Sequence, residues 1–357
     1  MKVSTLKTVL ITLSCLGLFL LWGVMALQGS LQALFEIKDS AVFPNGRRLK
    51  TSYTGIGPVD NLLCILVIFF DGLNNLVEPA QYLMLLELVS TLFVINMMTL
   101  VESRRPVKPR WARSPTLWQF LWNCGGVAVF LPIYSLLYIK QGPNNSVPLP
   151  APEAQALPFT ALWGLLLAIP LMTPALIDAA PFRTQDGVAL FFLAIPAFSG
   201  FQYLASFVIS KINYRGAQKP VQLAYRIVGT VSGLVHVGIV TYALTSDAAN
   251  TSLFKIFILN HSAVQNDSDI MTQAALLFIQ SDYVIITVVV VLLGIYTWYP
   301  EPVSGGKATA DGQGAAGSLI KLVGVMSTLG AGAGLAFVLH DKEGRKAPTR
   351  SSKKRLH

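Results

Sequence analysis

Charged residues are scarce in this sequence. Of its 357 residues, 13% are Asp, Glu, Lys or Arg, whereas 53% are hydrophobic. A soluble globular chain carries roughly a quarter charged residues, so the composition argues against a soluble fold. Long apolar runs replace the missing charge, and a helix needs about 20 apolar residues to cross a bilayer. We therefore expect an all-α polytopic transmembrane bundle over residues 1–340, followed by a basic cytoplasmic tail over 341–357.

Cysteine and histidine are also few. The three cysteines, Cys15, Cys64 and Cys124, lie in or beside apolar runs, and the four histidines are scattered. This pattern supports neither a disulfide framework nor a zinc site. Walker, G-x-S-x-G, H-E-x-x-H and D-D-x-x-D sequences are absent, which disfavours nucleotide, serine-hydrolase, zinc-protease and magnesium-diphosphate chemistry. No inverted repeat is evident, which weakens the case for a transporter.

Nine apolar segments are long enough to cross a membrane as helices, at about 17–25 residues each. They are residues 8–28, 61–77, 80–101, 117–139, 159–177, 188–210, 222–245, 276–297 and 319–339. We expect helices because an open strand cannot satisfy its backbone polar groups in lipid. The sequence therefore predicts about nine spans.

The distribution of basic residues predicts the orientation of these spans. The net charge of +9 comes mainly from Lys and Arg between the apolar segments, and such residues favour the cytoplasmic side. Nine spans with a luminal N-terminus and a cytoplasmic C-terminus place most of them, including Arg104–Arg110, in the cytoplasm. If the Pro-rich segment 159–177 only dips into the membrane, the numbers of Lys and Arg residues on the two sides become nearly equal. Three sequon-like triplets in the loop 246–275 oppose this orientation, so the side of that loop stays open.

The C-terminal Lys353-Lys354-Arg355 resembles a dibasic retrieval signal loosely. It suggests an integral membrane protein of the endoplasmic reticulum, although a solvated basic tail explains the same residues.

Three carboxylates inside the predicted spans are the main candidates for chemistry: Asp71, Glu87 and Asp282. A charge at membrane depth is costly unless it pairs, takes up a proton or meets water. Burial also raises the pKa of a carboxylic acid, which keeps it in the protonated state that a general acid needs. Asp71 and Glu87 flank a tight turn at Glu78-Pro79 and are expected at one depth, about 10–12 Å below the luminal surface. We predict that they form a catalytic pair, with separate pairing to Asn74, Gln81 or a backbone group as the alternative.

Two further carboxylates complete the catalytic candidates. Glu78 lies two helical turns from Asp71 and shares its helix face. Asp178 follows a segment loosened by Pro170 and Pro174. An interfacial or loop charge is the other interpretation of Asp178, as it is of Asp60 and Glu102.

Aromatic residues and one histidine are the candidates for substrate contact. Trp122 and Tyr203 lie deep in their segments, and an aromatic face can stabilise a carbocation. Ordinary helix packing is the alternative, and for His236 it is a single interhelical hydrogen bond. The predicted substrate-binding residues are Phe70, Tyr82, Trp122, Tyr203 and His236.

The run Tyr53-Thr54-Gly55-Ile56-Gly57-Pro58-Val59-Asp60, followed by Phe69-Phe70-Asp71-Gly72, resembles a fungal family. It is similar to the integral-membrane terpene cyclases of meroterpenoid pathways, of the ascochlorin, ascofuranone and macrophorin type. The similarity covers roughly residues 50–105, and elsewhere only hydropathy agrees. It implies protonation of a terminal epoxide or olefin on a lipophilic prenylated substrate, ring closure through a carbocation, and no metal or redox cofactor.

Two other classes of function stay open at this point. A proton- or cation-coupled transporter would use Asp71, Glu87 and Asp282 for coupling, and a membrane scaffold would use none of them. Nucleic acid is not expected as a partner, because aromatic and basic residues are not interleaved. The sequence gives no oligomeric state.

Overall fold

The chain folds into a bundle of helices. The structure, a computed structural model, describes residues 3–74, 76, 79–105, 114–140, 147–177, 180–212, 214, 216–246, 251–261, 270–298 and 312–345. Within these residues there is no β-strand, and one isolated antiparallel bridge joins Val42 to Arg48. The predicted all-α class is confirmed.

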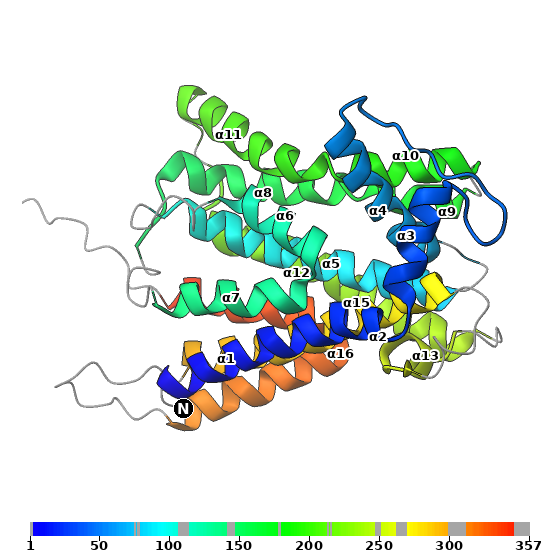
Figure 1. Ribbon diagram of the computed structural model, residues 1–357. Helices are drawn as coiled ribbons and strands as arrows, with labels where there is room; N and C mark the ends of the chain where they lie inside the picture. The colour runs from blue at the N-terminus through cyan, green and yellow to red at the C-terminus, as the bar shows by residue number, and fades with distance from the viewer. Residues whose placement is uncertain are drawn as a thin grey trace, which may run out of the picture.

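The helices follow one another in chain order as shown in Figure 1. They are α1 (Val3–Leu18), the π-helical turn η1 (Phe19–Gly23), α2 (Val24–Leu27), α3 (Ser30–Ser40), α4 (Gly57–Leu73), α5 (Pro79–Ser103), α6 (Pro115–Gly125), α7 (Val127–Lys140), α8 (Ala151–Leu166), α9 (Ile169–Leu176), α10 (Pro181–Phe191), α11 (Ala194–Ile212), α12 (Pro220–Thr245), α13 (Leu253–Phe257), α15 (Ile270–Trp298) and α16 (Gly312–Gly344).

Helix starts follow local chemistry. Proline stands in the first turn of α4, α6 and α12, where its missing N–H costs no hydrogen bond. At α6 the hydroxyl of Ser114 also accepts the N–H of Leu117 at 3.2 Å, which caps the helix.

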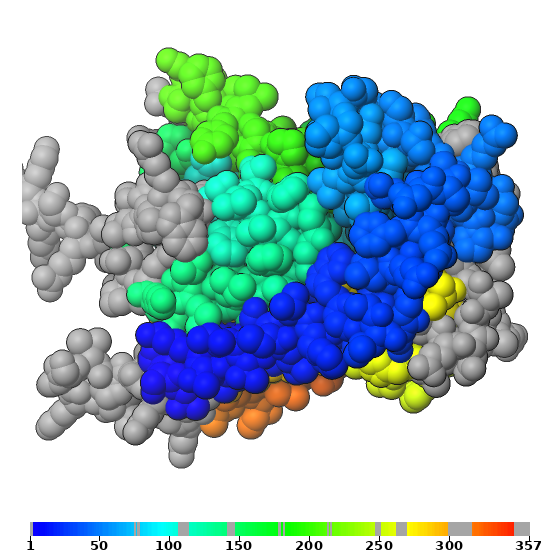
Figure 2. All heavy atoms as spheres, in the orientation of Figure 1, coloured from blue at the N-terminus to red at the C-terminus, as the bar shows by residue number. Residues whose placement is uncertain are grey.

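Helix α5 is the central element of the bundle, and 83% of its most apolar stretch is buried by other helices. It lies against α12, α15 and α16, as Figure 1 shows. The outer helices instead expose large apolar side chains, such as Phe19 of η1, Phe207 of α11 and Leu244 of α12. Figure 2 shows η1 and α11 on the surface of one face. A buried polar centre inside an apolar exterior is the arrangement expected in lipid.

Two helical segments fold back on themselves inside the bundle. In α16, Gly330 has φ +80°, and the side chains of Ser318 and Arg345 meet at 3.5 Å. A straight helix would separate those residues by about 40 Å. α6 and α7 likewise reverse at Gly126, with φ +96°, so that the rings of Trp118 and Tyr134 lie 5.1 Å apart. We call these two units the α16 hairpin and the α6–α7 hairpin.

The hairpins alter the predicted span count. Six helices of the described chain are long and apolar enough to cross a membrane, or seven with the bent pair α10 and α11. One of the six, Ala316–Gly344, is the folded α16 hairpin. The count of nine is not confirmed. Segments 117–139 and 319–339 turn back at glycines, and α4 is short at 17 residues.

The hairpins also bring the two ends of the described chain together. α1 runs antiparallel to α7, with Ser14 bonded to Val129 and Trp22 to Gly125. The end of α16 lies beside the end of α15, where Trp298 bonds Asp341 at 2.6 Å. Figure 1 shows the start of α1 and the end of α16 at the same end of the bundle, which we call the terminal end. The predicted orientation, with a luminal N-terminus and a cytoplasmic C-terminus, is not confirmed.

A buried ionic cluster fixes the terminal end. Arg105, 1% exposed, pairs with Glu102 at 3.1 Å and Glu343 at 2.5 Å, and donates to the carbonyl of Val147. Lys342 pairs with Glu102 at 3.1 Å. The cluster joins the end of α5 to the end of α16. Glu102, predicted as an interfacial charge, is one of its anions.

Candidate active site

Asp282, near the middle of α15, lies against the tip of the α6–α7 hairpin. Its Oδ1 accepts the backbone N–H of Ala128 at 2.6 Å, and the side chain is buried. The positive φ of Gly126 turns the start of α7 towards the carboxyl group. A Cβ at that glycine would lie 2.2 Å from Leu21 and 3.4 Å from Asp282 Oδ1. The hairpin thus aims a helix N-terminus at a carboxyl group, which favours its negative form once a proton has left.

Aromatic rings surround this carboxyl group. A small cavity is lined by Asp282 and by residues of α4, α5, α6, α7, α10 and α15. The Phe69 ring belongs to its wall and lies 5.3 Å from the ring of Phe70 and 4.9 Å from that of Phe278. The other aromatic members of the wall are Trp122 and Phe191.

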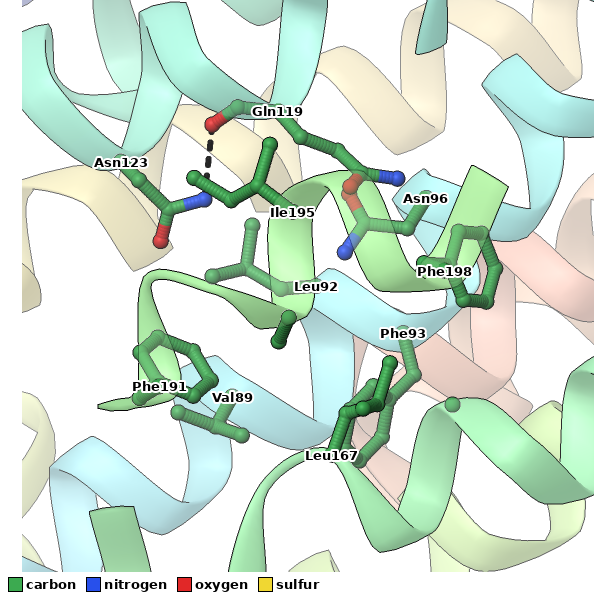
Figure 3. A pocket seen from close by; sticks show the side chains of 12 residues that line it. Val89, Leu92, Phe93, Asn96, Gln119, Asn123, Leu167, Phe191, Ile195 and Phe198 are labelled. Carbon is green, nitrogen blue, oxygen red and sulfur yellow. Dashed lines mark hydrogen bonds between the residues drawn. The ribbon is translucent and has the colours of Figure 1, made fainter. Parts of the chain in front are cut away.

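A second small cavity lies beside the first. The two share Val89, Leu92, Asn123 and Phe191 as lining residues. Figure 3 shows the second cavity, with Gln119, Asn123 and Asn96 on one side and Phe191, Val89 and Leu167 on the other. The two cavities are neighbours, and we call them together the chamber. Along α5 it extends from Leu85 to Asn96, about 16 Å at 1.5 Å per residue.

Of the predicted site residues, Asp282, Phe70 and Trp122 meet in the chamber. Phe278, Asn96 and Gln119 also line it but were not predicted. A neutral amide or a phenylalanine in an apolar segment does not indicate how deep it lies or which way its side chain points. The glycine pair Gly125-Gly126 was the one sequence signal that marks the hairpin tip.

Asp71 and Glu87 do not share a hydrogen-bonding site. Asp71 is ion-paired with Arg47, which donates from both terminal nitrogens, the longer contact being 3.4 Å. Glu87 accepts from the hydroxyl of Tyr283 at 2.7 Å and bonds Nδ1 of His236 at 3.0 Å. The expected pair is therefore replaced by two separate arrangements, because the loop before α4 supplies a cation to Asp71. Separate pairing was the alternative stated for these residues.

The Glu87 site lies at the tip of the α16 hairpin. The Tyr283 hydroxyl also accepts the N–H of Ala331 at 3.2 Å, just after the turn at Gly330. A Cβ at Gly330 would lie 2.8 Å from both Glu87 Oε1 and His236 Nδ1. Glu87 is fully buried and lines neither cavity of the chamber. His236 makes an interhelical hydrogen bond, which was its alternative interpretation.

The remaining predicted residues lie elsewhere. Tyr82 is buried and donates to the carbonyl of Met172 at 3.1 Å. Tyr203, expected deep in the bundle, is 63% exposed, with Arg104 over its ring at 3.9 Å. It faces outwards because α11 is an outer helix. Glu78 and Asp178 lie outside the described residues.

A third and larger hollow, of about 1480 Å³, opens between α4, α6, α10 and α11. Its walls are mostly apolar, with Leu62, Phe120 and Leu193 among them, and an ion pair of Lys50 and Asp186 at 2.6 Å marks one end. Ile195 lines both this hollow and the chamber, so the two are neighbours.

Comparison with known proteins identifies the family. The family model described as the CtvD domain matches residues 6–343. The chain belongs to the CtvD domain family.

Three curated fungal proteins similar to this chain are all named terpene cyclases. Terpene cyclase DEP1 of Fusarium langsethiae is 28% identical over 304 residues, which cover 79% of this chain and 83% of that protein. Terpene cyclase DEP1 of Alternaria brassicicola is 29% identical, covering 72% and 73%. Terpene cyclase alnG of Emericella nidulans is 27% identical and covers 55% of each chain. The predicted resemblance to fungal membrane terpene cyclases is confirmed. No solved structure matches the chain.

The motif that carried the resemblance builds a loop of this CtvD protein. Asp60 accepts hydrogen bonds from the backbone N–H groups of Tyr53, Thr54 and Gly55, and from the Thr54 hydroxyl at 2.8 Å. Burial would raise the pKa of Asp60, but these hydrogen bonds hold it at about 2. Asp60 thus stays ionised and fixes the loop. Tyr53 and Thr54 line the third hollow.

Metal-ligand types do not cluster in the part of the chain that the structure describes. No group of three or more His, Cys, Asp or Glu side chains there is arranged to hold a metal ion.

Proposed function

We propose that this protein is a membrane terpene cyclase that protonates a terminal epoxide or olefin of a prenylated substrate and closes its rings through a carbocation. The observation that carries the proposal is the Asp282 carboxyl group at one end of an aromatic chamber. The names of the curated relatives support the class of reaction.

Asp282 is the proposed proton donor. No Lys, Arg or His side chain is among the described residues that line the chamber. A buried carboxyl group without a cation beside it is more stable neutral than charged. Asp71 is a weaker candidate because Arg47 stabilises its anion. The chamber thus offers an acid in its proton-carrying form.

The reaction then balances as an isomerisation. The acid O–H bond breaks as a new O–H bond forms on the epoxide oxygen, and opening of the C–O bond leaves a tertiary carbocation. A neighbouring π bond attacks this centre, and one C–C bond forms for each ring. The last cation loses a proton to the Asp282 carboxylate, which regenerates the acid. With an olefin, the first proton forms a C–H bond instead.

The walls of the chamber suit a cationic intermediate. Phe69, Phe70, Trp122 and Phe278 present aromatic rings, and a ring face attracts a cation while offering no nucleophilic oxygen. After proton transfer, the first turn of α7 stabilises the Asp282 anion through the Ala128 N–H. These features support both halves of the proton cycle.

Lateral access from the bilayer fits a lipophilic substrate. The third hollow adjoins the chamber at Ile195 and has apolar walls. We place the protein in the membrane of the endoplasmic reticulum, with the terminal end facing the cytoplasm. Arg104, Arg105, Lys140 and Lys342 lie at that end, as the preference of basic residues for the cytoplasm requires.

The transporter alternative has less support. Coupled transport needs a continuous polar track, whereas Asp71, Glu87 and Asp282 each have their own partners, from the loop before α4, from α12 and α15, and from α7. Of the three, Asp282 alone lines the chamber.

The test uses microsomes containing wild type, Asp282→Asn, Glu87→Gln or Asp39→Asn, incubated with prenylated phenols that carry a terminal epoxide. We expect cyclic products from wild type and a loss of at least 100-fold in Asp282→Asn, the lower end of what general acids contribute. Asp39→Asn serves as the control, because that side chain is 76% exposed and lines none of the three cavities. Wild-type turnover by Asp282→Asn would remove Asp282 from the mechanism, and absence of product with wild type would remove the cyclase proposal for these substrates.

A further inference from the structure

Several buried hydrogen-bonding atoms of the chamber lack a partner in the described structure. They are Nε2 of Gln119, Nε1 of Trp122 and Oδ1 of Asn96. Gln119 and Trp122 are each 2% exposed. Most buried polar groups in proteins are hydrogen-bonded, and an unpartnered one requires an explanation. Three of them on the walls of one space indicate that a ligand completes the site.

These atoms do not serve the fold. Gln119 and Asn96 each make their structural hydrogen bonds through the backbone. The carbonyl of Gln119 accepts from the Asn123 amide at 2.7 Å, and that of Asn96 accepts from the Thr99 hydroxyl at 2.9 Å. Figure 3 shows both side-chain amides on the same side of the second cavity.

The polar atoms and the acid occupy different parts of the chamber. Asn96 and Gln119 line the second cavity only, Asp282 lines the first only, and Trp122 lines the first beside it. A molecule that satisfies the amides therefore reaches Asp282 with its apolar part, past Val89, Leu92 and Phe191.

The charge of the walls limits the chemistry of that molecule. With no Lys, Arg or His among the described lining residues, an anionic group would be buried without a counter-charge. A neutral group with one donor and one acceptor matches Gln119 Nε2, which donates, and Asn96 Oδ1, which accepts.

We propose that the Asn96–Gln119 end of the chamber binds the neutral head group of the substrate, an oxygenated group such as a phenol or enol that both donates and accepts a hydrogen bond. The prenyl chain then extends towards Asp282. This assignment names the substrate class of the proposed cyclase and rests on that function for the direction of the chain. It excludes prenyl diphosphates and carboxylates as substrates.

Binding can be measured without turnover. The probe is 2-(hexahydrofarnesyl)phenol, whose saturated chain has no double bond to protonate. Its methyl ether lacks the donor, and hexahydrofarnesyl phosphate is an anion of similar chain length. Each is titrated against the full chain in lipid nanodiscs, with radiolabelled probe and a thermal unfolding scan as readouts.

We expect wild type to bind the phenol about tenfold more tightly than the ether, as one lost hydrogen bond predicts, and to bind the phosphate least. Asn96→Leu should abolish the preference for phenol over ether, because its acceptor is gone. Gln119→Leu should weaken binding of the phenol and binding of the ether by a similar factor. Since both changes remove an unpartnered polar group, the empty variants should unfold at or above the wild-type temperature.

Gln222→Leu is the matched control. Its Nε2 donates to the carbonyl of His340 at 3.1 Å, away from the chamber. This variant should lose thermal stability and keep wild-type binding. If Gln119 had only a structural role, Gln119→Leu would also lose thermal stability and keep wild-type binding. That result would overturn the proposal.

Other outcomes also decide against it. Equal or tighter binding of the phosphate, an unchanged phenol preference in Asn96→Leu, or no saturable binding of the phenol would each refute the neutral head group. These results are independent of catalysis, since the saturated probe offers neither an epoxide nor a double bond to protonate. Failure of the cyclase proposal would appear only in the turnover assay.

Discussion

Asp282 and Tyr283 are consecutive residues of α15, and each receives a backbone N–H from the tip of a different hairpin. Ala128 donates to Asp282 at 2.6 Å, and Ala331 donates to the Tyr283 hydroxyl at 3.2 Å. Adjacent helical residues point about 100° apart, so α15 separates two buried carboxyl groups. One lies in the aromatic chamber, and the other, Glu87, lies at the α16 tip. We therefore expect different consequences when each is disturbed.

The turn of the α16 hairpin requires glycine. Gly330→Ala introduces a Cβ 2.8 Å from Glu87 and His236 at φ +80°, a backbone conformation that L-residues rarely adopt. We expect a loss of about 1–3 kcal/mol of unfolding free energy, seen as a lower melting temperature in detergent. Gly324→Ala is the control, because its Cβ meets no atom within 4 Å. An equal effect of the two changes would argue against the turn.

Because α16 folds back, its two ends should face the same side of the membrane. In a cysteine-free background, Ser318→Cys and Arg345→Cys are expected to react with an impermeant maleimide from the same side of sealed microsomes. A single straight helix would expose them on opposite sides, since the side chains would then be about 40 Å apart. Labelling of the two cysteines from opposite faces would therefore refute the hairpin.

The sequence predicted which segments of this fold are helical, but not where the chain reverses its direction. Hydropathy located the apolar segments 117–139 and 319–339 correctly, yet a hairpin and a span have the same composition. The reversal depends on the positive φ of Gly126 and Gly330. Glycine is also common in straight membrane helices, so these positions did not stand out.

The candidate site was predicted in part for a similar reason. The cost of burying charge identified Asp71, Glu87 and Asp282 as residues that need an explanation. Their partners come from distant positions, Arg47, Tyr283 and Ala128. The position of a residue along its helix does not determine which groups of the neighbouring elements face its side chain. Asn96 and Gln119, the proposed head-group residues, have neutral side chains. Burying them carries no cost of buried charge, so the sequence did not single them out.

The hydroxyl of Tyr283 holds the α16 tip against α5. Tyr283→Phe removes the donor to Glu87 and the acceptor for the Ala331 N–H. Leaving buried partners unsatisfied costs about 1–3 kcal/mol, which a denaturation curve in detergent would measure. Cyclisation per folded molecule should be retained, because Glu87 lines neither cavity. Tyr296→Phe, on the same helix, loses one 3.3 Å hydrogen bond to Ile139 and should cost less.

The ionic cluster should be essential to stability. Arg105→Met leaves Glu343 without its 2.5 Å partner and weakens the neutralisation of Glu102. Removing one partner of a buried ion pair typically costs about 3–5 kcal/mol. Arg345→Met breaks a pair with Asp341 in which the arginine is 50% exposed, and it should change the melting temperature little. Similar melting temperatures for the two variants would contradict a structural role for the cluster.

Gly126 links the fold to the proposed chemistry. Gly126→Ala places a Cβ 2.2 Å from Leu21 and 3.4 Å from Asp282 Oδ1, at φ +96°. The start of α7 must shift, which moves the Ala128 N–H away from Asp282. If that N–H stabilises the anion left after proton transfer, turnover should fall by about tenfold or more, the equivalent of one hydrogen bond to a charged group. Binding of the saturated phenol should change less, because Asn96 and Gln119 belong to other parts of the chamber.

Gly200→Ala on α11, whose Cβ meets no atom within 4 Å, controls for glycine replacement as such. A Gly126→Ala protein that folds and turns over like wild type would show that the hairpin tip does not assist Asp282.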